Sequence, residues 1–195
     1  MIGNDIIDLK EARLKSNWER PRFLKKVYSS DEQRLIKNAE NPFEMVWRMW
    51  SMKESAYKFY LQKNPKAKRG FYPAKIKTKI LTSENGQVFF NNDKIITRTQ
   101  THSSYIFTTA FLDPTSPNET AVFYLPRKNY QLQSSFTRHK LMDFLAEEKQ
   151  FNLEELELRK GKNNIPKLYY RTKALPFNCS LTHHGNYGGF SISMK

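Results

Sequence analysis

The longest helical pattern in the chain runs from Pro42 to about Gln62. Apolar residues recur every three or four positions along it, which is the spacing of one face of a helix. Asn41 is a suitable N-cap, Pro42 suits the first turn, and Glu44 can complete a capping box. The apolar stripe consists of Phe43, Val46, Trp47, Trp50, Tyr57 and Leu61. The pattern predicts one long helix that buries this stripe.

Glu54 interrupts the stripe at a position where a core residue is expected. Lys58 follows one helical turn later on the same side. A charge on a buried face is unfavourable unless it is paired or binds a cation. Glu54 is therefore the first candidate for a functional residue. The structural alternative is a plain surface ion pair between Glu54 and Lys58.

Alternating residues at the amino-terminal end predict a short strand over residues 1–9. The alternation places Gly3, Asp5 and Ile7 on one face and Asp8 on the other. Asp5 is then an acid among apolar neighbours and becomes a second candidate. An alternative of equal weight is that Asp5 is a turn or cap residue, since Asn-Asp pairs often are.

Hydrophobic spacing and turn residues divide the rest of the chain into short elements. Helices are expected at residues 20–28, 29–36 and 135–149, and strands at 75–81, 88–90, 105–112, 120–125, 156–158, 167–171, 178–182 and 187–192. The helix at 29–36 opens on a capping box of Ser29 and Glu32. Between the elements we expect turns at 84–86 and 113–118, a basic loop at 63–70 and a linker at 126–133.

A weak internal repeat indicates how these elements are organised. Residues 101–105 (THSSY) resemble residues 182–187 (THHGNY) with one residue inserted, and each segment follows a turn and precedes a strand. We therefore expect an α+β protein of two similar halves, residues 1–126 and 127–195, each with a small antiparallel sheet and a packed helix. The halves are expected to form one compact unit.

The amino-acid composition limits the kinds of partner and the cellular compartment that we expect. The 33 lysines and arginines exceed the 19 acids and give a net charge of +14, which favours a polyanionic or acidic partner. Cys179 is the only cysteine, so an internal disulfide is excluded and a reducing compartment is favoured. Neither an apolar run of membrane-spanning length nor a signal-peptide profile is present, so we expect a cytoplasmic protein that does not bind a membrane.

Several common kinds of site are disfavoured by their missing motifs. His183 and His184 have no Cys or His partners at zinc spacing, and the chain lacks a nucleophile elbow, a P-loop and a dinucleotide fingerprint. Two carboxylates on separate rigid elements are instead a common way to hold Mg²⁺, which completes its shell with water and phosphate oxygens. Asp5 and Glu54 fit that description, and Lys58 can neutralise phosphate charge. The residues alone thus indicate a magnesium and phosphate site.

Four motifs, taken in their order along the chain, resemble those of the 4′-phosphopantetheinyl transferase superfamily. Gly3-Asn4-Asp5 resembles its G-x-D motif, and residues 50–58 (WSMKESAYK) resemble W-x-x-K-E-[AS]-x-x-K. Residues 180–183 (SLTH) resemble S-x-[ST]-H, and residues 23–32 (FLKKVYSSDE) resemble the phenylalanine-to-glutamate segment between the first two. The resemblance spans nearly the whole chain, and it implies the fold of that superfamily.

The resemblance also implies a reaction. Such enzymes transfer the 4′-phosphopantetheine arm from coenzyme A to a serine of an apo carrier protein and release 3′,5′-ADP. By this resemblance, Asp5 and Glu54 would hold Mg²⁺ against the pyrophosphate, and Glu54 would help to deprotonate the serine. Lys58 would stabilise charge on the phosphates during transfer. Phosphoryl transfer depends mostly on positioning and charge neutralisation, which these residues can supply.

Coenzyme A and the carrier protein complete the set of implied partners. Ser180 and His183 would hold the nucleotide end of coenzyme A, and Arg138 resembles a further coenzyme A contact. The charge of +14 suits both a polyanionic cosubstrate and an acidic carrier. The motif order resembles that of holo-acyl-carrier-protein synthases and thereby favours fatty-acid biosynthesis, although the residues do not choose among fatty-acid, polyketide and peptide carriers.

The chain departs from the superfamily pattern in three places. Ile7 replaces the second acid of G-x-D-x-E, and the G-K-P turn is loosened to residues 161–166 (GKNNIP). The acid half precedes the histidine half, which is the reverse of the two-halved members. We therefore expect a monomer in which the two halves are exchanged in order and pack as a pseudo-dimer with one site between them. Thr101-His102 would be a degenerate copy of Thr182-His183. The alternatives are a basic nucleic-acid-binding protein and a non-catalytic relative that binds coenzyme A.

Overall fold

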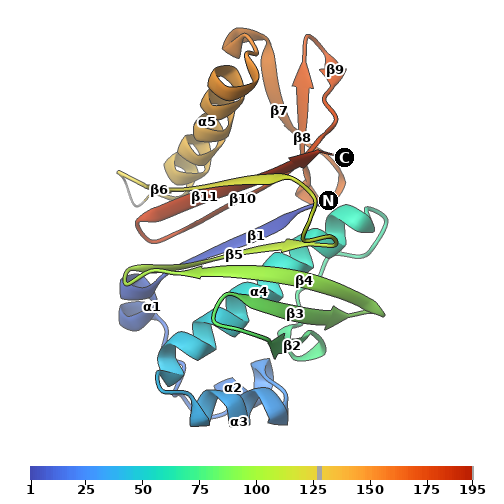
Figure 1. The fold of residues 1–195 in the computed structure, drawn as a ribbon. Helices are drawn as coiled ribbons and strands as arrows, with labels where there is room; N and C mark the ends of the chain where they lie inside the picture. Colours follow the sequence, from blue (N-terminus) through green and yellow to red (C-terminus); the bar gives the residue numbers. More distant parts are fainter. Residues whose placement is uncertain (127–128, 195) are drawn as a thin grey trace.

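Two antiparallel sheets lie next to each other in the middle of the molecule, and a long helix covers each of them (Figure 1). The computed structural model describes residues 1–126 and 129–194. The larger sheet has the strand order β1-β5-β4-β3-β2, and the smaller one has the order β10-β11-β6. A third, hairpin-like sheet, β7-β8-β9, stands beside α5 at the top of Figure 1. The fold is therefore α+β, as expected.

The helices are α1 (Leu9–Lys15), α2 (Phe23–Val27), α3 (Ser30–Asn38), α4 (Pro42–Lys63) and α5 (Tyr130–Lys149), with 3₁₀ turns η1 (Pro73–Lys75), η2 (Leu153–Glu155) and η3 (Lys162–Asn164). The strands of the larger sheet are β1 (Gly3–Asp8), β2 (Lys77–Ile80), β3 (Asn85–Phe90), β4 (Asp93–Thr101) and β5 (Tyr105–Phe111). The remaining strands are β6 (Asn118–Tyr124), β7 (Leu156–Lys160), β8 (Pro166–Tyr170), β9 (Lys173–Ala174), β10 (Phe177–His184) and β11 (Tyr187–Met194).

Several element boundaries differ from the expectation. The turn predicted at 84–86 is wrong because Asn85 and Gly86 belong to β3, and the chain turns at 81–84 instead. Strand β4 was not predicted, although Asn91 and Asn92, both with positive φ, form the tight turn that leads into it. The predicted linker 126–133 is also partly wrong, since α5 begins at Tyr130 behind an Asn129 cap. Arg127 and Lys128 of that linker lie outside the described residues.

Helix α4 is buried on two sides rather than on one. The expected stripe is largely buried, but Trp47, Trp50, Tyr57 and Leu61 line a cavity together with Glu54. A second buried face packs against the larger sheet and consists of Met52, Ala56 and Phe59, which meet Val88, Ile95 and Ala110. The face of α4 that carries Glu54 therefore borders the cavity and not the sheet, which explains why an acid can interrupt the apolar stripe.

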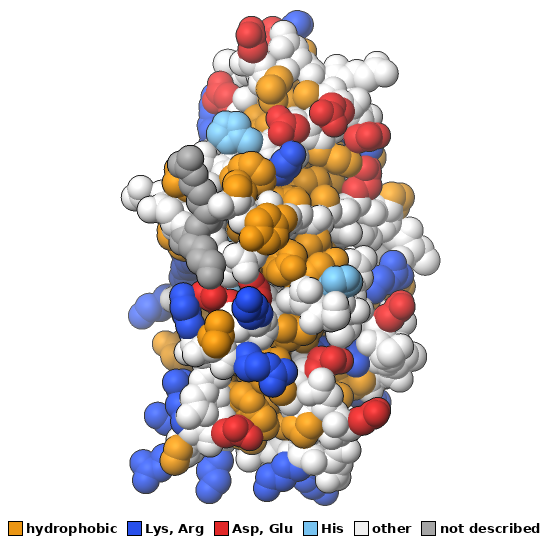
Figure 2. Space-filling model, turned by 90° about the vertical axis from the view of Figure 1, so that its left-hand side faces the viewer, with side chains coloured by type: hydrophobic (Ala, Val, Ile, Leu, Met, Phe, Trp, Pro, Cys, Tyr) orange, Lys and Arg blue, Asp and Glu red, His pale blue; other side chains and the backbone are white. Residues whose placement is uncertain are grey.

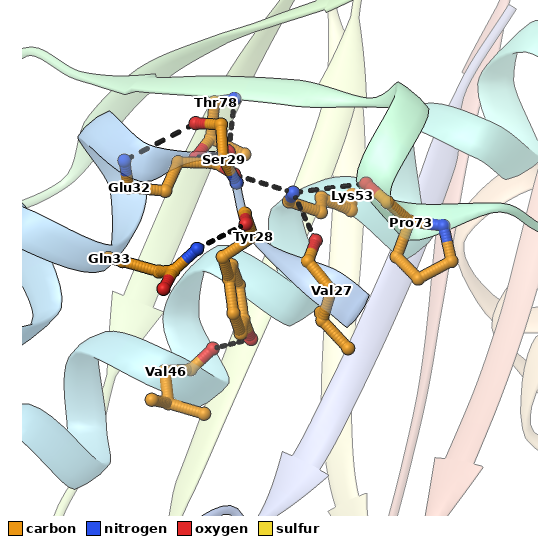
Figure 3. A network of polar contacts seen from close by, with 9 residues as sticks. All are labelled: Val27, Tyr28, Ser29, Glu32, Gln33, Val46, Lys53, Pro73 and Thr78. Carbon is orange, nitrogen blue, oxygen red and sulfur yellow. Dashed lines mark hydrogen bonds and ion pairs between the residues drawn. The ribbon is translucent and has the colours of Figure 1, made fainter. Parts of the chain in front are cut away.

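A buried ion pair holds α4 to the helices before it (Figure 3). Lys53 Nζ donates to Glu32 Oε2 (2.8 Å), to the Val27 carbonyl (2.9 Å) and to the Pro73 carbonyl (3.0 Å). Glu32 in turn accepts from the Ser29 and Thr78 backbone N–H groups and from the Thr78 hydroxyl. The capping box of Ser29 and Glu32 is confirmed, and Glu32 also serves as the buried partner of Lys53.

The two main sheets meet along β1 and β10 through side chains. Three backbone N–H groups of β1, on alternate residues, donate to side chains on alternate residues of β10. The pairs are Asn4 with Ser180 Oγ (3.1 Å), Ile6 with Thr182 Oγ1 (3.3 Å) and Asp8 with His184 Nδ1 (2.9 Å). We call these three contacts the seam. It satisfies one edge of β1 without merging the two sheets into one.

The chain passes from the larger to the smaller sheet between β5 and β6. Strand β6 pairs with β11, so residues 118–124 belong to the same sheet as β10. The division into halves at residues 126 and 127 stays a prediction. Across the described residues, no helix combines the length and the apolar character needed to cross a bilayer.

Candidate active site

A cavity of about 730 Å³ lies where the acid-bearing elements meet the histidine-bearing ones. Its walls come from β1 and α4 on one side and from α5, β10 and the loop before β8 on the other. All six site residues proposed from the sequence line it, namely Asp5, Glu54, Lys58, Arg138, Ser180 and His183. The structure thus brings together, within one chain, residues that are up to 178 positions apart in sequence.

Gly3 allows the two acids to share this cavity. A Cβ atom at position 3 would overlap the Ser55 carbonyl oxygen and lie 2.6 Å from the Phe59 backbone nitrogen. The backbone of β1 therefore runs directly against α4, which only glycine permits at this point. That close approach sets Asp5, two residues along β1, beside the face of α4 that carries Glu54 and Lys58.

Asp5 is buried and its carboxylate is only half paired. Its Oδ1 accepts from Lys58 Nζ (3.2 Å) and from the Thr182 hydroxyl (3.3 Å). Its Oδ2 has no hydrogen-bond partner among the described residues. Burial raises the pKa of Asp5, while Lys58 acts most strongly in the opposite direction and His184 and Ser51 act more weakly. Lys58 also donates to the Asn4 carbonyl (2.8 Å), which fixes its ammonium beside Asp5.

Glu54 also has a strongly perturbed carboxyl group facing the cavity. Burial, and then repulsion from Asp5, raises the pKa of Glu54 to about 7, while Lys58 and Arg69 lower it. A carboxyl group with a pKa near neutrality can both release and accept a proton at physiological pH. Glu54 therefore has the acidity expected of a general base.

The two carboxylates fit a small divalent cation. Two negative groups that repel each other in a buried site gain most from a shared cation. Asp5 Oδ2 is a buried oxygen without a partner in the described part of the chain, and such an atom is suited to be a ligand. No cluster of three or more potential metal-binding side chains occurs within the described ranges, so water or phosphate oxygens would have to complete the shell, as Mg²⁺ usually requires.

His183 is held with a defined ring nitrogen toward its neighbour on α5. The Gln133 amide donates through Nε2 to the Gly185 carbonyl (2.7 Å), so its Oε1 faces His183 Nδ1 at 3.1 Å. Because that oxygen only accepts, Nδ1 must carry the proton. The ring also packs edge-on to Tyr130. Burial, with smaller effects of Lys58 and His184, lowers the pKa of His183.

Ser180 lines the cavity but its hydroxyl oxygen is already engaged. The Asn4 N–H donates to Ser180 Oγ at 3.1 Å, and the residue is 3% exposed. The structure therefore gives Ser180 a role in the seam. A contact of Ser180 with a nucleotide stays a prediction.

Sequence reasoning missed several cavity residues. Lys15, Arg20, Arg69 and Lys160 add positive charge around the two acids. Arg69 belongs to the basic loop at 63–70, whose charge was the only signal for it. Thr182 lies in the S-x-[ST]-H segment, but the pattern contains nothing that reveals its contact with Asp5.

The loosened turn at 161–166 closes one side of the cavity. Asn163 has a positive φ, and its Nδ2 donates to the carbonyls of Pro65 (3.2 Å) and Ala67 (3.0 Å). The loop before β8 is thereby fastened to the basic loop that carries Arg69. The turn expected at residues 162–164 is confirmed, and Asn163 and Asn164 both have the positive φ that asparagine tolerates.

Comparison with protein families identifies the family of the chain. A family model described as the 4′-phosphopantetheinyl transferase superfamily matches residues 1–114. The matched segment contains Asp5, Glu54 and Lys58, whereas Arg138, Ser180 and His183 lie beyond it. No curated protein matches the chain.

Proposed function

The chain belongs to the 4′-phosphopantetheinyl transferase superfamily, and on that premise we propose that it transfers the 4′-phosphopantetheine arm of coenzyme A to a serine of an acidic apo carrier protein, with Mg²⁺ as cofactor. The family uses coenzyme A as its substrate and acts on carrier proteins. The released product is 3′,5′-ADP. The observation that carries the proposal is the cavity in which Asp5, Glu54 and Lys58 lie opposite His183 and Arg138.

The reaction exchanges one phosphorus–oxygen bond for another. The serine oxygen bonds to the phosphorus nearest the pantetheine, and the bond from that phosphorus to the leaving 3′,5′-ADP breaks. Glu54, directly or through water, accepts the proton of the serine hydroxyl, for which a pKa of about 7 is well suited. Lys58 places a positive charge where the phosphates gain negative charge. Asp5 and Glu54 would hold Mg²⁺, which would add positive charge against the pyrophosphate.

The opposite wall is proposed to hold the nucleotide end of coenzyme A. His183, whose Nδ1 donates to Gln133, has Nε2 as an acceptor for a hydroxyl group such as that of a ribose. Arg138 adds a permanent positive charge on α5, and Ser180 keeps its hydroxyl proton available after accepting from Asn4. Arg69 and Lys160 add further positive charge to the cavity wall near the loop before β8.

The proposed carrier is acidic because the surface beside the site is basic. On the face shown in Figure 2, Lys and Arg side chains gather over the lower part of the molecule, where α1, α2 and α3 lie in Figure 1. Such a surface attracts an acidic carrier and aligns it for transfer. We assign the chain to the holo-acyl-carrier-protein synthase type, with fatty-acid biosynthesis as the pathway and the cytoplasm as its location.

We further propose that one chain is the active unit. Its two halves would correspond to a pseudo-dimer related by an approximate twofold axis, with their order exchanged relative to other two-halved members. The support for this proposal is that one chain supplies both walls of the cavity. A monomer in solution that retains full activity is the expected result.

The test is a transfer assay. The protein is incubated with coenzyme A, Mg²⁺ and a panel of apo carriers, and each carrier is weighed by mass spectrometry. Addition of the arm is expected with at least one acidic carrier. Glu54→Gln should abolish transfer while the protein stays folded, whereas Glu44→Gln, at the start of the same helix and outside the cavity, should not.

Two results would contradict the proposal in different ways. Coenzyme A binding without transfer to any carrier would favour the non-catalytic relative. Tight nucleic-acid binding that falls steeply with salt and does not depend on Glu54 would favour the nucleic-acid-binding alternative.

A further inference from the structure

Thr182 joins the two walls of the cavity through a single hydroxyl group. Its Oγ1 lies 3.3 Å from the Ile6 backbone nitrogen and 3.3 Å from Asp5 Oδ1. Thr182 is 5% exposed, so water does not compete freely for either contact. The other two rungs of the seam, from Ser180 and His184, each bind a backbone N–H of β1. Thr182 differs from them in that its hydroxyl also contacts a carboxylate.

The Thr182 hydroxyl can donate its proton to only one of its two contacts. The Ile6 N–H is a donor only, so Thr182 Oγ1 must accept from it. The hydroxyl then has its single proton left, and that proton points to Asp5 Oδ1. The N–H of Ile6 on β1 thus fixes the direction in which the Thr182 hydroxyl on β10 donates, which is toward Asp5.

The two carboxylate oxygens of Asp5 therefore differ in their hydrogen bonding. Asp5 Oδ1 receives Thr182 and Lys58, while Oδ2 receives no hydrogen bond within the described ranges. Rotation of the carboxyl group would break both contacts of Oδ1 at once. The carboxylate is therefore locked in one orientation by groups from both sides of the seam.

We propose that Thr182 is a positioning residue that holds Asp5 with Oδ2 directed to a divalent cation. This inference rests on the proposed function, in that the cation belongs to the same site. Hydrogen-bonded partners of metal-binding carboxylates orient the ligand and raise metal affinity. The histidine-bearing strand would thus contribute to the metal site without itself binding the metal.

The proposal predicts distinct effects for two substitutions at one position. Thr182→Val keeps the branched shape and removes the donated proton, so Asp5 loses one of its two anchors. Removal of such a partner weakens metal binding by about 10–100-fold. Thr182→Ser keeps the hydroxyl and should bind the metal within about threefold of the wild-type affinity, as expected if the hydrogen bond and not the methyl group matters.

Thr109→Val is the matched control. Thr109 is also 5% exposed, and its Oγ1 contacts Ser191 Oγ at 3.4 Å across the same pair of sheets. The substitution removes a buried hydroxyl between the sheets but touches neither Asp5 nor Glu54. It should lower the melting temperature about as much as Thr182→Val does and leave metal affinity unchanged.

The experiment uses Mn²⁺ as the probe, since free Mn²⁺ is counted by electron paramagnetic resonance. The full chain is titrated with Mn²⁺ in the presence of coenzyme A and without a carrier, and Asp5→Asn serves as the reference for a lost site. Weaker binding by Thr182→Val, with rescue by Thr182→Ser and no change in Thr109→Val, supports the proposal.

Other outcomes overturn it or separate it from the proposed function. Equal Mn²⁺ affinity of Thr182→Val and wild type overturns the positioning role, as does a wild-type protein whose Mn²⁺ binding is absent or unaffected by Asp5→Asn. If Mn²⁺ binding depends on Thr182 but no carrier accepts the arm, the inference stands and the transferase proposal fails. If transfer proceeds and the Mn²⁺ affinity does not depend on Thr182, the transferase proposal stands and the positioning role of Thr182 fails.

Discussion

Replacing Lys53 by methionine should destabilise the protein strongly, although the residue touches no part of the cavity. The Lys53 side chain is 0% exposed and that of its partner Glu32 is 2% exposed. Methionine would leave the Glu32 carboxylate buried without its cation and the Val27 carbonyl without the Lys53 donor, while the Pro73 carbonyl would keep only the Ile76 N–H. The losses at Glu32 and Val27 are buried, so water cannot readily compensate for them.

The magnitude follows from the burial of the pair. Breaking a buried ion pair by removing one partner costs about 3–5 kcal/mol. For a chain of this length each kcal/mol lowers the melting temperature by about 2–4 °C, so a fall of about 6–20 °C is expected. Burial lowers the pKa of Lys53 although Glu32 opposes it, which indicates that the attraction does not fully offset the loss of hydration. Lys53→Met combined with Glu32→Gln should therefore recover part of the loss.

Lys63→Met provides the comparison on the same helix. Lys63 pairs with Asp93 near the surface, where an ion pair contributes about 1 kcal/mol or less. Urea unfolding of wild type, both single variants and the double variant measures the free energies of unfolding. If Lys53→Met costs no more than Lys63→Met, the role assigned to the buried network is wrong.

Two further predictions concern Glu54 and Gly3. Between pH 4.5 and 7 the folded protein keeps a proton on Glu54 that the unfolded chain has released, so the free energy of unfolding should fall by at most about 3 kcal/mol as pH rises through this window. Glu54→Gln should reduce that slope to the part contributed by Asp5, whose pKa burial also raises, and an unchanged slope in the variant would assign it to another group. Gly3→Ala should cost about 3 kcal/mol in urea unfolding and abolish transfer, because the added Cβ forces β1 away from α4. Gly86→Ala, whose Cβ meets the flexible end of Met52, should cost less, and equal costs would count against the close approach as the reason for Gly3.

The part of the site that sequence predicts well is the part built from local, rigid elements. Gly3 to Asp5 lie on one short strand, and residues 50–58 lie on one long helix with a clear apolar period. Periodicity therefore identifies Glu54 as an acid on an apolar face before any fold is known. The face was assigned to the core, whereas it lines a cavity, because apolar spacing reports burial and does not report what lies opposite.

The part that sequence did not predict depends on contacts between distant segments. Lys53 is adjacent to Glu54, but two of its partners are backbone carbonyls, which any residue type supplies. The contact of Thr182 with Asp5 joins residues 177 positions apart, and the spacing of a hydroxyl residue on a strand carries no sign of it. Strand β4 differs from these contacts in that a local signal marks its start, since the Asn91-Asn92 pair forms the tight turn before it.

The seam has a consequence for the making of the protein. Its rungs connect residues 176 positions apart, so β10 must leave the ribosome before the edge of β1 can be closed. Contacts of such long sequence separation form late, because the chain between them must first be ordered. Until then the β1–α4 unit holds two neighbouring carboxylates with one wall of the cavity missing. A chain cut short before β10 would therefore keep the acids and lack the enclosure, and synthesis itself would limit the complete site to full-length molecules.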